Sequence, residues 1–465
     1  MNRSDLHKYQ ERGVDFIISH NACCLFLDMG LGKSVTTLTA ISDLIDYCEI
    51  SSILVIAPKK VAESTWAQEV VKWEHLRHLR VSVVLGTAKQ RTEALLNEAD
   101  IYVTSRDNVV WVLEQTRKNK KKFDMLVLDE LTSFKNSAAK RFKALRKYRP
   151  FVSRCVGLTG TPTPNGLKDL WAQLYCVDMG NALGRSKTRF IDTFFDTYVR
   201  DHIMYNCTPK KGAEKEIYRQ ISPITLTMKA EDYLSLPPMI ERDIKVTPSK
   251  AVMKRYEEFE RDRVLEFASE LENTEGNIIA GNAAALCNKL CQFANGAIYT
   301  EEHEVLYLHD EKLDMFAEIV EQAQAEGNSV LVFYQFKHDC SRIMARPEFK
   351  DLHVRLYEGD HDLVDWNAGK IDILLTHAAS TAYGLNLQRG GNVIVWYGTG
   401  WNAELYLQGN ARLHRQGQQK PVTVFRLVVA GTMDETALKA IDDKVRGQEA
   451  MLNALKDRIK RFNVA

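Results

Sequence analysis

Short apolar runs rich in β-branched residues recur along this chain in two separate sets. The first set is CCLFLD from residue 23, ILVIAP from 53, VSVVL from 81, IYVTS from 101, MLVLDE from 125 and CVGLTGT from 155. Unbroken runs of this kind suit strands that are buried on both faces, and the longer polar and apolar stretches between them suit crossover helices. The pattern predicts a parallel sheet covered by helices.

A second set of the same kind follows: SVLVFY from residue 329, VRLYEG from 354, DILLTH from 372, NVIVWYG from 392 and VTVFRLVV from 422. A polar, proline-marked segment (221–243) and helical periodicity over much of 250–325 separate the two sets. The predicted fold class is therefore α/β, with two tandem parallel-sheet domains. We expect an N-terminal domain over 1–224 and a C-terminal domain over 225–465, with a helical insertion at about 250–325 and a C-terminal helix.

Composition excludes several classes of protein. The 465 residues are 45% hydrophobic, which is enough for two or three buried cores. A formal net charge of +1 excludes a wholesale basic coat, so any nucleic-acid contact would have to come from a local groove. The nine cysteines lack the spacing of a zinc site, and no apolar run reaches the roughly 18 residues that span a bilayer. We expect a soluble, cytoplasmic protein with no membrane partner.

A glycine-containing turn, FLDMGLGKSV (26–35), joins the first predicted strand to the first predicted helix. Backbone N–H groups of such a turn can hold phosphate oxygens, while Lys33 would reach the β- and γ-phosphates of a nucleotide and the Ser34 hydroxyl would bind magnesium. Leu27 stands where the strict phosphate-loop pattern has its first glycine. For this motif alone, an unrelated tight turn therefore remains an alternative.

Two adjacent carboxylates, Asp129 and Glu130, end another predicted strand. Carboxylates at the end of a buried strand are costly unless they meet a cation or a reacting water. Asp129 is therefore the candidate magnesium ligand, acting through water, and Glu130 is the candidate general base that deprotonates the attacking water. A solvated strand end that caps a helix is the alternative.

Arg412 and Arg415, within QGNARLHRQGQ (408–418), would share one face of a helix because they are three residues apart. Two guanidinium groups on one face can bind a γ-phosphate and stabilise its developing charge. Since both arginines belong to the second predicted domain, ATP would bind in the cleft between the domains. A solvated basic helix face is the alternative.

In order and approximate spacing, these segments resemble the motifs of the Swi/Snf-like branch of superfamily-two helicases and translocases, above all the compact forms of phages and prophages. The resemblance covers most of residues 6–440 and implies two RecA-like domains. The matching segments, apart from the phosphate loop, are LHKYQERGVDFI (6–17), ILVIAPKKVAESTWAQEV (53–70), LVLDELTSFKN (126–136), GLTGTPTPNGLKDLWAQLYCVD (157–178) and WNAELYLQGNARLHRQGQ (401–418).

The resemblance also implies roles for individual residues. Gln10 would read the adenine, and Gln408 would close on the γ-phosphate with the two arginines. Thr159 and Thr161 would couple hydrolysis to domain movement. The other ATP contacts implied are Met29, Gly30, Leu31, Gly32, Lys33, Ser34 and Gly384. The nucleic-acid contacts implied are Lys59, Thr104, Ser105, Arg106, Gln335, Ser380 and Thr381, with helix capping or plain solvation as the alternative.

Three segments depart from the family pattern. Leu131 and Thr132 follow the paired carboxylates in place of the usual residues, and Ala382 and Tyr383 stand where the family has paired glycines. The paired arginines of the family's linker are absent from PITLTMKAEDYLSLPP (223–238). These changes concern the coupling of hydrolysis to movement rather than ATP binding.

The predicted function is that of a DNA-dependent ATPase that uses ATP and magnesium to translocate along duplex DNA in preference to single strands. We expect a monomer in a bacterial or phage-infected cell, with replication, recombination or nuclease proteins as candidate partners. Two alternatives stay open. One is a nucleotide-gated DNA-binding clamp with little hydrolysis, which the altered coupling segments keep open although the intact Lys33, Glu130, Arg412 and Arg415 argue against it. The other is an RNA-directed helicase of the same superfamily.

Overall fold

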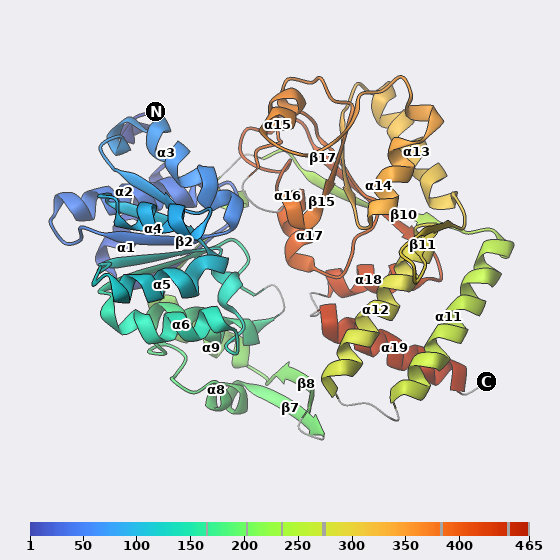
Figure 1. The fold of residues 1–465 in the computed structure, drawn as a ribbon, viewed down its shortest axis with the longest axis horizontal. Helices are drawn as coiled ribbons and strands as arrows, with labels where there is room; N and C mark the ends of the chain where they lie inside the picture. Colours follow the sequence, from blue (N-terminus) through green and yellow to red (C-terminus); the bar gives the residue numbers. More distant parts are fainter. Residues whose placement is uncertain are drawn as a thin grey trace. The chain divides into compact units, whose positions relative to one another are not determined.

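In the computed structural model the chain divides into two compact units, Met1–Ser235 and Leu236–Ala465. The structure describes residues 1–163, 166–200, 203–233, 236–271, 276–381, 385–443 and 447–463. Each unit contains a parallel sheet with helices packed on it (Figure 1). The predicted α/β class with two parallel-sheet domains is therefore confirmed.

The sheet of the first unit has seven strands in the order β3-β4-β2-β5-β6-β1-β9, and its pairs are parallel. The first six strands along the chain coincide with the predicted apolar runs, because their residues are almost wholly buried. The strands are β1 (Ala22–Leu27), β2 (Ile53–Ala57), β3 (Val81–Val84), β4 (Ile101–Ser105), β5 (Met125–Asp129), β6 (Arg154–Thr159) and β9 (Thr225–Met228).

Helices connect these strands and cover the sheet. One continuous hydrophobic core joins residues of β1, β2 and β5 to residues of the helices that follow β4, β5 and β6. The helices are α1 (Lys8–Ser19), α2 (Lys33–Asp46), α3 (Trp66–Lys72), α4 (Ala88–Leu96), α5 (Val109–Lys118), α6 (Lys140–Tyr148), α7 (Leu170–Asp178), α8 (Lys187–Phe194), α9 (Ala213–Ile221) and α10 (Ala230–Tyr233).

The strand β9 was not predicted, because its residues TLTM lie in the polar segment that precedes the second set of runs. It pairs with β1, with Cys24 opposite Thr225. Directly after β1, the N–H of Asp28 donates to the Met228 carbonyl (3.1 Å), and the Asp28 carboxylate accepts from the N–H of Ala230 (2.9 Å). Residues 225–233 therefore belong to the first unit, which extends to Ser235.

A two-stranded antiparallel hairpin, β7 (Phe195–Arg200) and β8 (Ile203–Pro209), lies between α8 and α9. The sequence does not predict this hairpin, since neither strand is a continuous apolar run.

The sheet of the second unit has six parallel strands in the order β10-β17-β16-β13-β15-β14. Five of them coincide with predicted runs, whereas β10 is mostly exposed and charged and was not predicted. The strands are β10 (Met239–Val246), β13 (Val330–Tyr334), β14 (Val354–Leu356), β15 (Ile373–His377), β16 (Val393–Trp396) and β17 (Val422–Val429).

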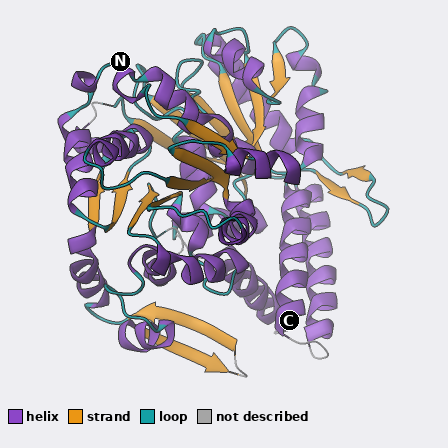
Figure 2. Cartoon of the chain, turned by 60° about the vertical axis from the view of Figure 1, so that its left-hand side comes forward, coloured by secondary structure: helices purple, strands orange, loops and turns teal. Residues whose placement is uncertain are grey.

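Figure 2 shows purple helices packed against the orange strands. In the second unit, α11, α12, α18 and α19 share a hydrophobic core separate from the two clusters that flank the sheet. The helices are α11 (Lys250–Leu271), α12 (Gly276–Ala294), α13 (Glu311–Ala325), α14 (Lys337–Met344), α15 (Asp360–Asn367), α16 (Ala378–Thr381), α17 (Ala403–Asn410), α18 (Met433–Asp442) and α19 (Gly447–Asn463), and a hairpin of β11 (Ala297–Tyr299) and β12 (Val305–Tyr307) follows α12. Each helix in the described part of the chain is too short or too polar to cross a bilayer.

Candidate nucleotide and nucleic-acid site

The turn between β1 and α2 has the backbone of a phosphate-binding loop. Gly30 and Gly32 have left-handed φ angles of 89° and 78°, and Gly32 is the N-cap of α2. The left-handed φ at Gly32 favours glycine, and a Cβ atom there would also lie 2.3 Å from Nε2 of Gln10 and displace that side chain. The turn therefore leads into the N-terminus of a helix, where backbone N–H groups and the helix dipole favour an anion.

Gln10, on α1, is buried beside this loop. Its Nε2 donates to the Leu31 carbonyl at 3.2 Å, and its Oε1 accepts from the N–H of His7 at 2.9 Å. The structure thus brings the predicted adenine-reading residue into contact with the predicted phosphate loop.

Lys33 begins α2, and its ammonium group turns back onto the loop. The Nζ donates to the carbonyls of Leu27 (2.7 Å) and Asp28 (3.3 Å). Gly160, after β6, is close by, because a Cβ atom there would lie 3.4 Å from Lys33 Nζ and 3.4 Å from Cγ of Met29. The lysine, the loop and the predicted coupling segment therefore form one site, with Ser34 half-buried in the next position of α2.

Asp129 ends β5 with 8% of its surface exposed, and its Oδ2 accepts from the Trp66 indole Nε1 at 3.1 Å. Burial raises the pKa of this carboxyl, while the charge of Lys33 and the Trp66 hydrogen bond act in the opposite direction. A buried carboxylate near a lysine suits Mg²⁺, which takes one or two carboxylates and completes its shell with water and phosphate oxygens. Among the described residues, no group of three or more His, Cys, Asp or Glu side chains could hold a metal ion by itself.

Glu130 has φ 57° and ψ 64°, a left-handed conformation that is rare outside glycine. Such a backbone costs a non-glycine residue on the order of 1 kcal/mol, and residues held in strained conformations are enriched at active sites. The two residues that depart from the family pattern, Leu131 and Thr132, are buried directly after it. Leu131 packs on β6, since a Cβ atom at Gly157 would lie 2.7 Å from its Cδ2. These two residues, which differ from the family pattern, therefore pack in the core directly after Glu130. Glu130 is itself half-buried.

The coupling candidates, Thr159 and Thr161, lie at the end of β6 and in the loop after it. The hydroxyl of Thr159 is buried and accepts from the N–H of Thr161 at 3.1 Å. The next carbonyl, of Pro162, accepts from Nε2 of Gln173 on α7 at 2.8 Å. The loop that approaches Lys33 through Gly160 is thus bonded to both β6 and α7.

In the second unit, Arg412 and Arg415 converge on one carbonyl group. The Nη1 atom of each lies 3.1 Å from the carbonyl oxygen of Leu385. The expectation that they share a helical face is wrong, because α17 ends at Asn410 and turns follow. Gln408 is buried in α17, and its carbonyl accepts from Arg412 Nε at 2.9 Å. The three arginine-motif residues are therefore adjacent, while Gly384 lies outside the described residues.

The nucleic-acid candidates of the first unit divide into accessible and buried residues. Lys59 is 71% exposed and pairs with Glu63 only at 3.9 Å, and Arg106 donates to the Ser133 hydroxyl at 3.0 Å. Thr104 is fully buried, however, and its hydroxyl donates to the Val84 carbonyl at 3.0 Å; Ser105 is 3% exposed. The expectation that Thr104 and Ser105 present their side chains to a strand is corrected, because both side chains are buried at the end of β4.

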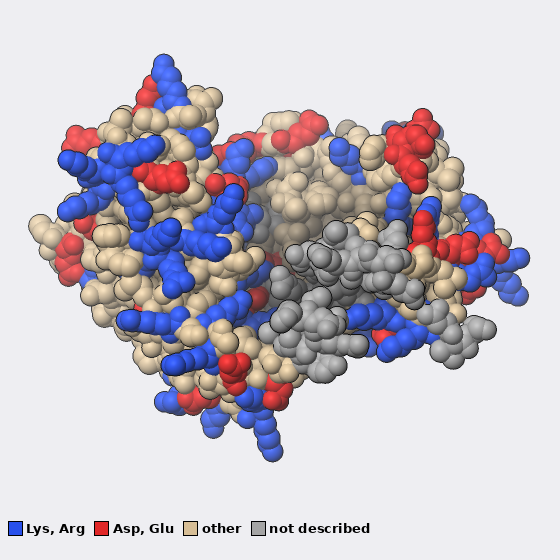
Figure 3. Space-filling view, turned by 60° about the horizontal axis from the view of Figure 1, so that its bottom comes forward, with Lys and Arg blue, Asp and Glu red and all other residues tan. Residues whose placement is uncertain are grey.

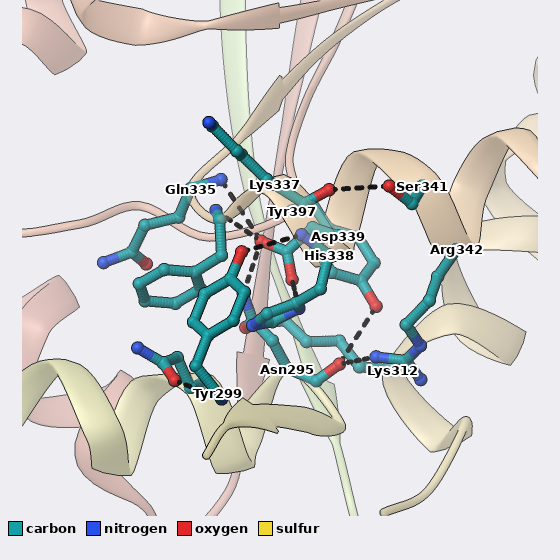
Figure 4. A network of polar contacts seen from close by, with 12 residues as sticks. Asn295, Tyr299, Lys312, Gln335, Lys337, His338, Asp339, Ser341, Arg342 and Tyr397 are labelled. Carbon is teal, nitrogen blue, oxygen red and sulfur yellow. Dashed lines mark hydrogen bonds and ion pairs between the residues drawn. The ribbon is translucent and has the colours of Figure 1, made fainter. Parts of the chain in front are cut away.

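In the second unit, Gln335 lies in the turn between β13 and α14, and Ser380 is exposed on α16. The side chain of Thr381 lies outside the described part of the structure. Asp339 anchors the Gln335 turn (Figure 4): its Oδ2 accepts from the backbone N–H groups of Gln335 (3.3 Å) and Phe336 (2.9 Å) and from Nδ2 of Asn295 (3.0 Å).

Asn295 connects this carboxylate to two buried cations (Figure 4). Its Oδ1 accepts from Nζ of Lys312 at 2.8 Å, and its carbonyl accepts from Nη1 of Arg342. Lys312, which is 1% exposed, also pairs with Asp434. Because each buried charge in this network has a partner, the network can hold the start of α14 in one geometry.

Sequence reasoning missed Trp66 and Asp339 as parts of the site. An apolar position indicates only core for Trp66, and no local pattern links it to a carboxylate 63 residues away. Asp339 did offer a signal, since it is the third residue of α14 and such an acidic residue commonly accepts from the backbone N–H at the N-cap.

Replacing Trp66 by Phe removes the indole donor to Asp129. We expect the pKa of Asp129 to rise further and the magnesium concentration for half-maximal ATP hydrolysis to increase about tenfold, the effect of one hydrogen bond to a charged group. The effect should grow as the pH falls, because a higher pKa favours the protonated form, which does not bind metal. Trp73→Phe is the matched control, since Trp73 donates to Glu69 (2.9 Å) in the same way. Equal magnesium requirements in the two variants would contradict this role.

Replacing Asp339 by Asn puts an NH₂ group on a side chain whose oxygen now accepts hydrogen bonds from three N–H groups. We expect a loss of about 2 to 4 kcal/mol in the free energy of unfolding, measured with urea, and several-fold weaker nucleic-acid binding because the Gln335 turn loses its anchor. Asp362→Asn is the control. Asp362 is also fully buried and accepts from the N–H groups of Glu358 and Gly359 at the start of α15. It should cost similar stability and leave binding unchanged, so equal binding losses would refute a specific role for Asp339.

Two parallel-sheet units, one with a phosphate loop beside an Asp-Glu pair and one with a pair of convergent arginines, define the helicase-like class of ATPases. The family follows from the sequence: residues 9–293 match the SNF2-related domain, so the chain belongs to the SNF2-related family.

The chain is also similar to individual proteins and to a solved structure. Protein p41 of Acyrthosiphon pisum secondary endosymbiont phage 1 is 34% identical over 463 residues, which are 96% of this chain and 98% of p41. The ISWI chromatin-remodeling complex ATPase ISW1 of Saccharomyces cerevisiae is 25% identical over 486 residues, 98% of this chain but 41% of the yeast protein. A solved SWI2/SNF2 ATPase core of Sulfolobus solfataricus, in complex with dsDNA, has a TM-score of 0.45 and 24% identity, covering 98% of this chain and 96% of that one.

The chain spans less than half the length of the eukaryotic relatives that it matches. The prediction of a Swi/Snf-like family member is confirmed, and so is that of a nucleic-acid-dependent ATPase, since relatives are named ATPases or an ATP-dependent helicase.

Proposed function

We propose that this protein is a motor that hydrolyses ATP when it is bound to duplex DNA and thereby moves along the DNA. The observation that supports the proposal best is the site around Lys33. The phosphate loop, the buried Asp129, the strained Glu130 and the coupling loop at Gly160 all lie at the C-terminal ends of β1, β5 and β6. Ligands of parallel α/β sheets bind at this end of the strands.

In this proposal Gln10 recognises the adenine, the backbone of residues 29–32 holds the phosphates, and Lys33 neutralises the β- and γ-phosphates. The residues that would hold magnesium are Ser34 and Asp129; the ion would neutralise charge that develops on the transferred phosphoryl group. Glu130 takes the proton from the attacking water.

We assign Arg412 and Arg415, with Gln408, to the γ-phosphate in the closed state of the motor. Their shared contact with one backbone carbonyl supports this role, because a guanidinium pair that is already gathered loses little freedom when it binds phosphate. Gly384 remains assigned to the same site from the family pattern alone.

The proposed contacts with the DNA backbone are Lys59, Arg106, Gln335 and Ser380. Lys59 is exposed, Arg106 and Gln335 directly follow strands, and Ser380 lies in the helix that follows a strand. Thr104 and Ser105 are buried at the end of β4 and support these contacts without touching the DNA. A DNA contact by Thr381 stays a prediction. Such contacts position the strand without reading its sequence. Thr159 and Thr161 couple ATP hydrolysis to movement through the loop that approaches Lys33.

We place the activity in the cytoplasm of a bacterial or phage-infected cell, as the phage relative p41 suggests.

The test is ATP hydrolysis by the whole chain without nucleic acid and with single-stranded DNA, duplex DNA or RNA. Strong stimulation by duplex DNA, together with displacement of a triplex-forming strand, would support a translocase. Tight ATP-dependent DNA binding with negligible hydrolysis under every condition would overturn the motor and leave the nucleotide-gated clamp. Stimulation by RNA alone would favour the RNA-directed alternative.

A further inference from the structure

A basic surface on the first unit has no role in the steps above. From Leu131 to Lys168 the sequence contains no Asp or Glu. The basic residues of this segment are Lys135, Lys140, Arg141, Lys143, Arg146, Lys147, Arg149, Arg154 and Lys168. In a chain whose formal net charge is +1, this is a strong local excess of positive charge.

The helix α6 arranges part of this charge in a line. Phe142, Leu145 and Tyr148 are its buried residues. The exposed Lys140, Lys143 and Lys147, which we call the lysine stripe, are separated by three and four residues and therefore lie along one face. Within the described part of the chain, none of the three is ion-paired to a carboxylate, whereas Lys89, Lys229 and Lys254 elsewhere are.

Neighbouring elements extend this surface with further basic groups. Arg117, on α5, donates from Nη2 to the carbonyl of Lys147 (3.3 Å), and Lys187, on α8, donates to the Ser137 hydroxyl (3.3 Å) just before α6. Figure 3 shows Lys and Arg side chains spread over the face of the first unit that it presents. Along the chain the stripe follows one of the proposed DNA contacts, since Arg106 donates to Ser133, which is seven residues before Lys140.

We propose that the lysine stripe binds the phosphate backbone of duplex DNA that continues beyond the segment held by the contacts named above; this inference rests on the proposed function. At about 1.5 Å per residue, Lys140 to Lys147 spans about 10 Å. Over that length of duplex axis one strand carries about three phosphates, at about 3.4 Å of axis each, so the stripe faces a comparable number of charges. Because the stripe places positive charges in a line on a protein proposed to act on duplex DNA, we assign it to that DNA rather than to an acidic protein partner.

The experiment compares the wild type with the triple variant Lys140→Gln/Lys143→Gln/Lys147→Gln. The control variant Lys89→Gln/Lys254→Gln/Lys350→Gln removes three positive charges from exposed lysines elsewhere. Binding is measured by fluorescence anisotropy on labelled duplexes of about 12 and about 40 base pairs, over about 50 to 200 mM salt. Circular dichroism confirms that the variants are folded, and ATP hydrolysis is measured at saturating long duplex.

For the stripe variant we expect about tenfold weaker binding to the long duplex and a salt dependence shallower by about 2 to 3 in the slope of log K against log salt. Binding to the short duplex, and hydrolysis at saturation, should stay unchanged. Equal losses in the two triple variants, or on the two duplex lengths, would overturn the inference. So would unchanged duplex binding together with lost binding to polyglutamate. If the wild type bound no duplex at all, the proposed function itself would fail, which is a distinguishable result.

Discussion

Replacing Glu130 by Gln is expected to lower DNA-stimulated ATP hydrolysis by about a thousandfold, within the range of general-base catalysis, and to leave ATP binding nearly unchanged. Gln has the size of Glu and can still donate to or accept from a water molecule, but it cannot take the water's proton. Single-turnover hydrolysis with radiolabelled ATP measures the first quantity, and titration with a fluorescent ATP analogue measures the second.

Glu114→Gln is the matched control, since Glu114 is exposed on α5 and has no role in the proposed site. It should hydrolyse ATP at the wild-type rate. A Glu130→Gln protein that retains more than about a tenth of wild-type hydrolysis would assign the base to another residue, because removing a positioned base costs about a hundredfold or more.

Replacing Lys33 by Ala should have the second of the two largest effects and a different signature. The ammonium group is expected to contact the β- and γ-phosphates both in the bound state and during transfer, so its loss should weaken ATP binding and hydrolysis together, each by about a hundredfold. Stability should change little, since the contacts of Nζ described above are hydrogen bonds to backbone carbonyls of a half-exposed loop.

Lys89→Ala removes the same side chain from an exposed position on α4 and should be neutral for ATP binding and hydrolysis. Normal ATP affinity in Lys33→Ala would show that the turn between β1 and α2 is not the nucleotide site. The two substitutions together separate binding from chemistry, because only the lysine variant should lose affinity.

The sheets were largely predictable because strands buried on both faces must be continuously apolar. The strands that escaped prediction are those for which this condition fails. β10 is mostly exposed, and β9 lies at the end of its sheet within a polar segment. The hairpin of β7 and β8 depends on pairing between two short runs of mixed polarity, which sequence periodicity does not predict.

Within the site, local sequence predicted the residues whose spacing is fixed by one turn, such as Gly30, Gly32 and Lys33. Asp129 was also predictable, since a carboxylate at the end of an apolar run is unusual. The tryptophan that donates to it and the carbonyl of Leu385 that gathers the arginines come from distant segments, so only the fold reveals them. Thr104 shows the opposite error, because a hydroxyl at a strand end can equally turn inward.

The pairing of β9 with β1 also decides which part of the chain could fold as an independent nucleotide-binding fragment. The motifs of the first unit end by residue 178, and a fragment chosen from them, or one ending at 224, would lack β9. The strand that leads into the phosphate loop would then expose a row of unpaired N–H and C=O groups, which is a template for intermolecular β pairing and aggregation. A fragment that extends through Tyr233 protects this strand, keeps the Asp28–Ala230 hydrogen bond and includes the whole of α10.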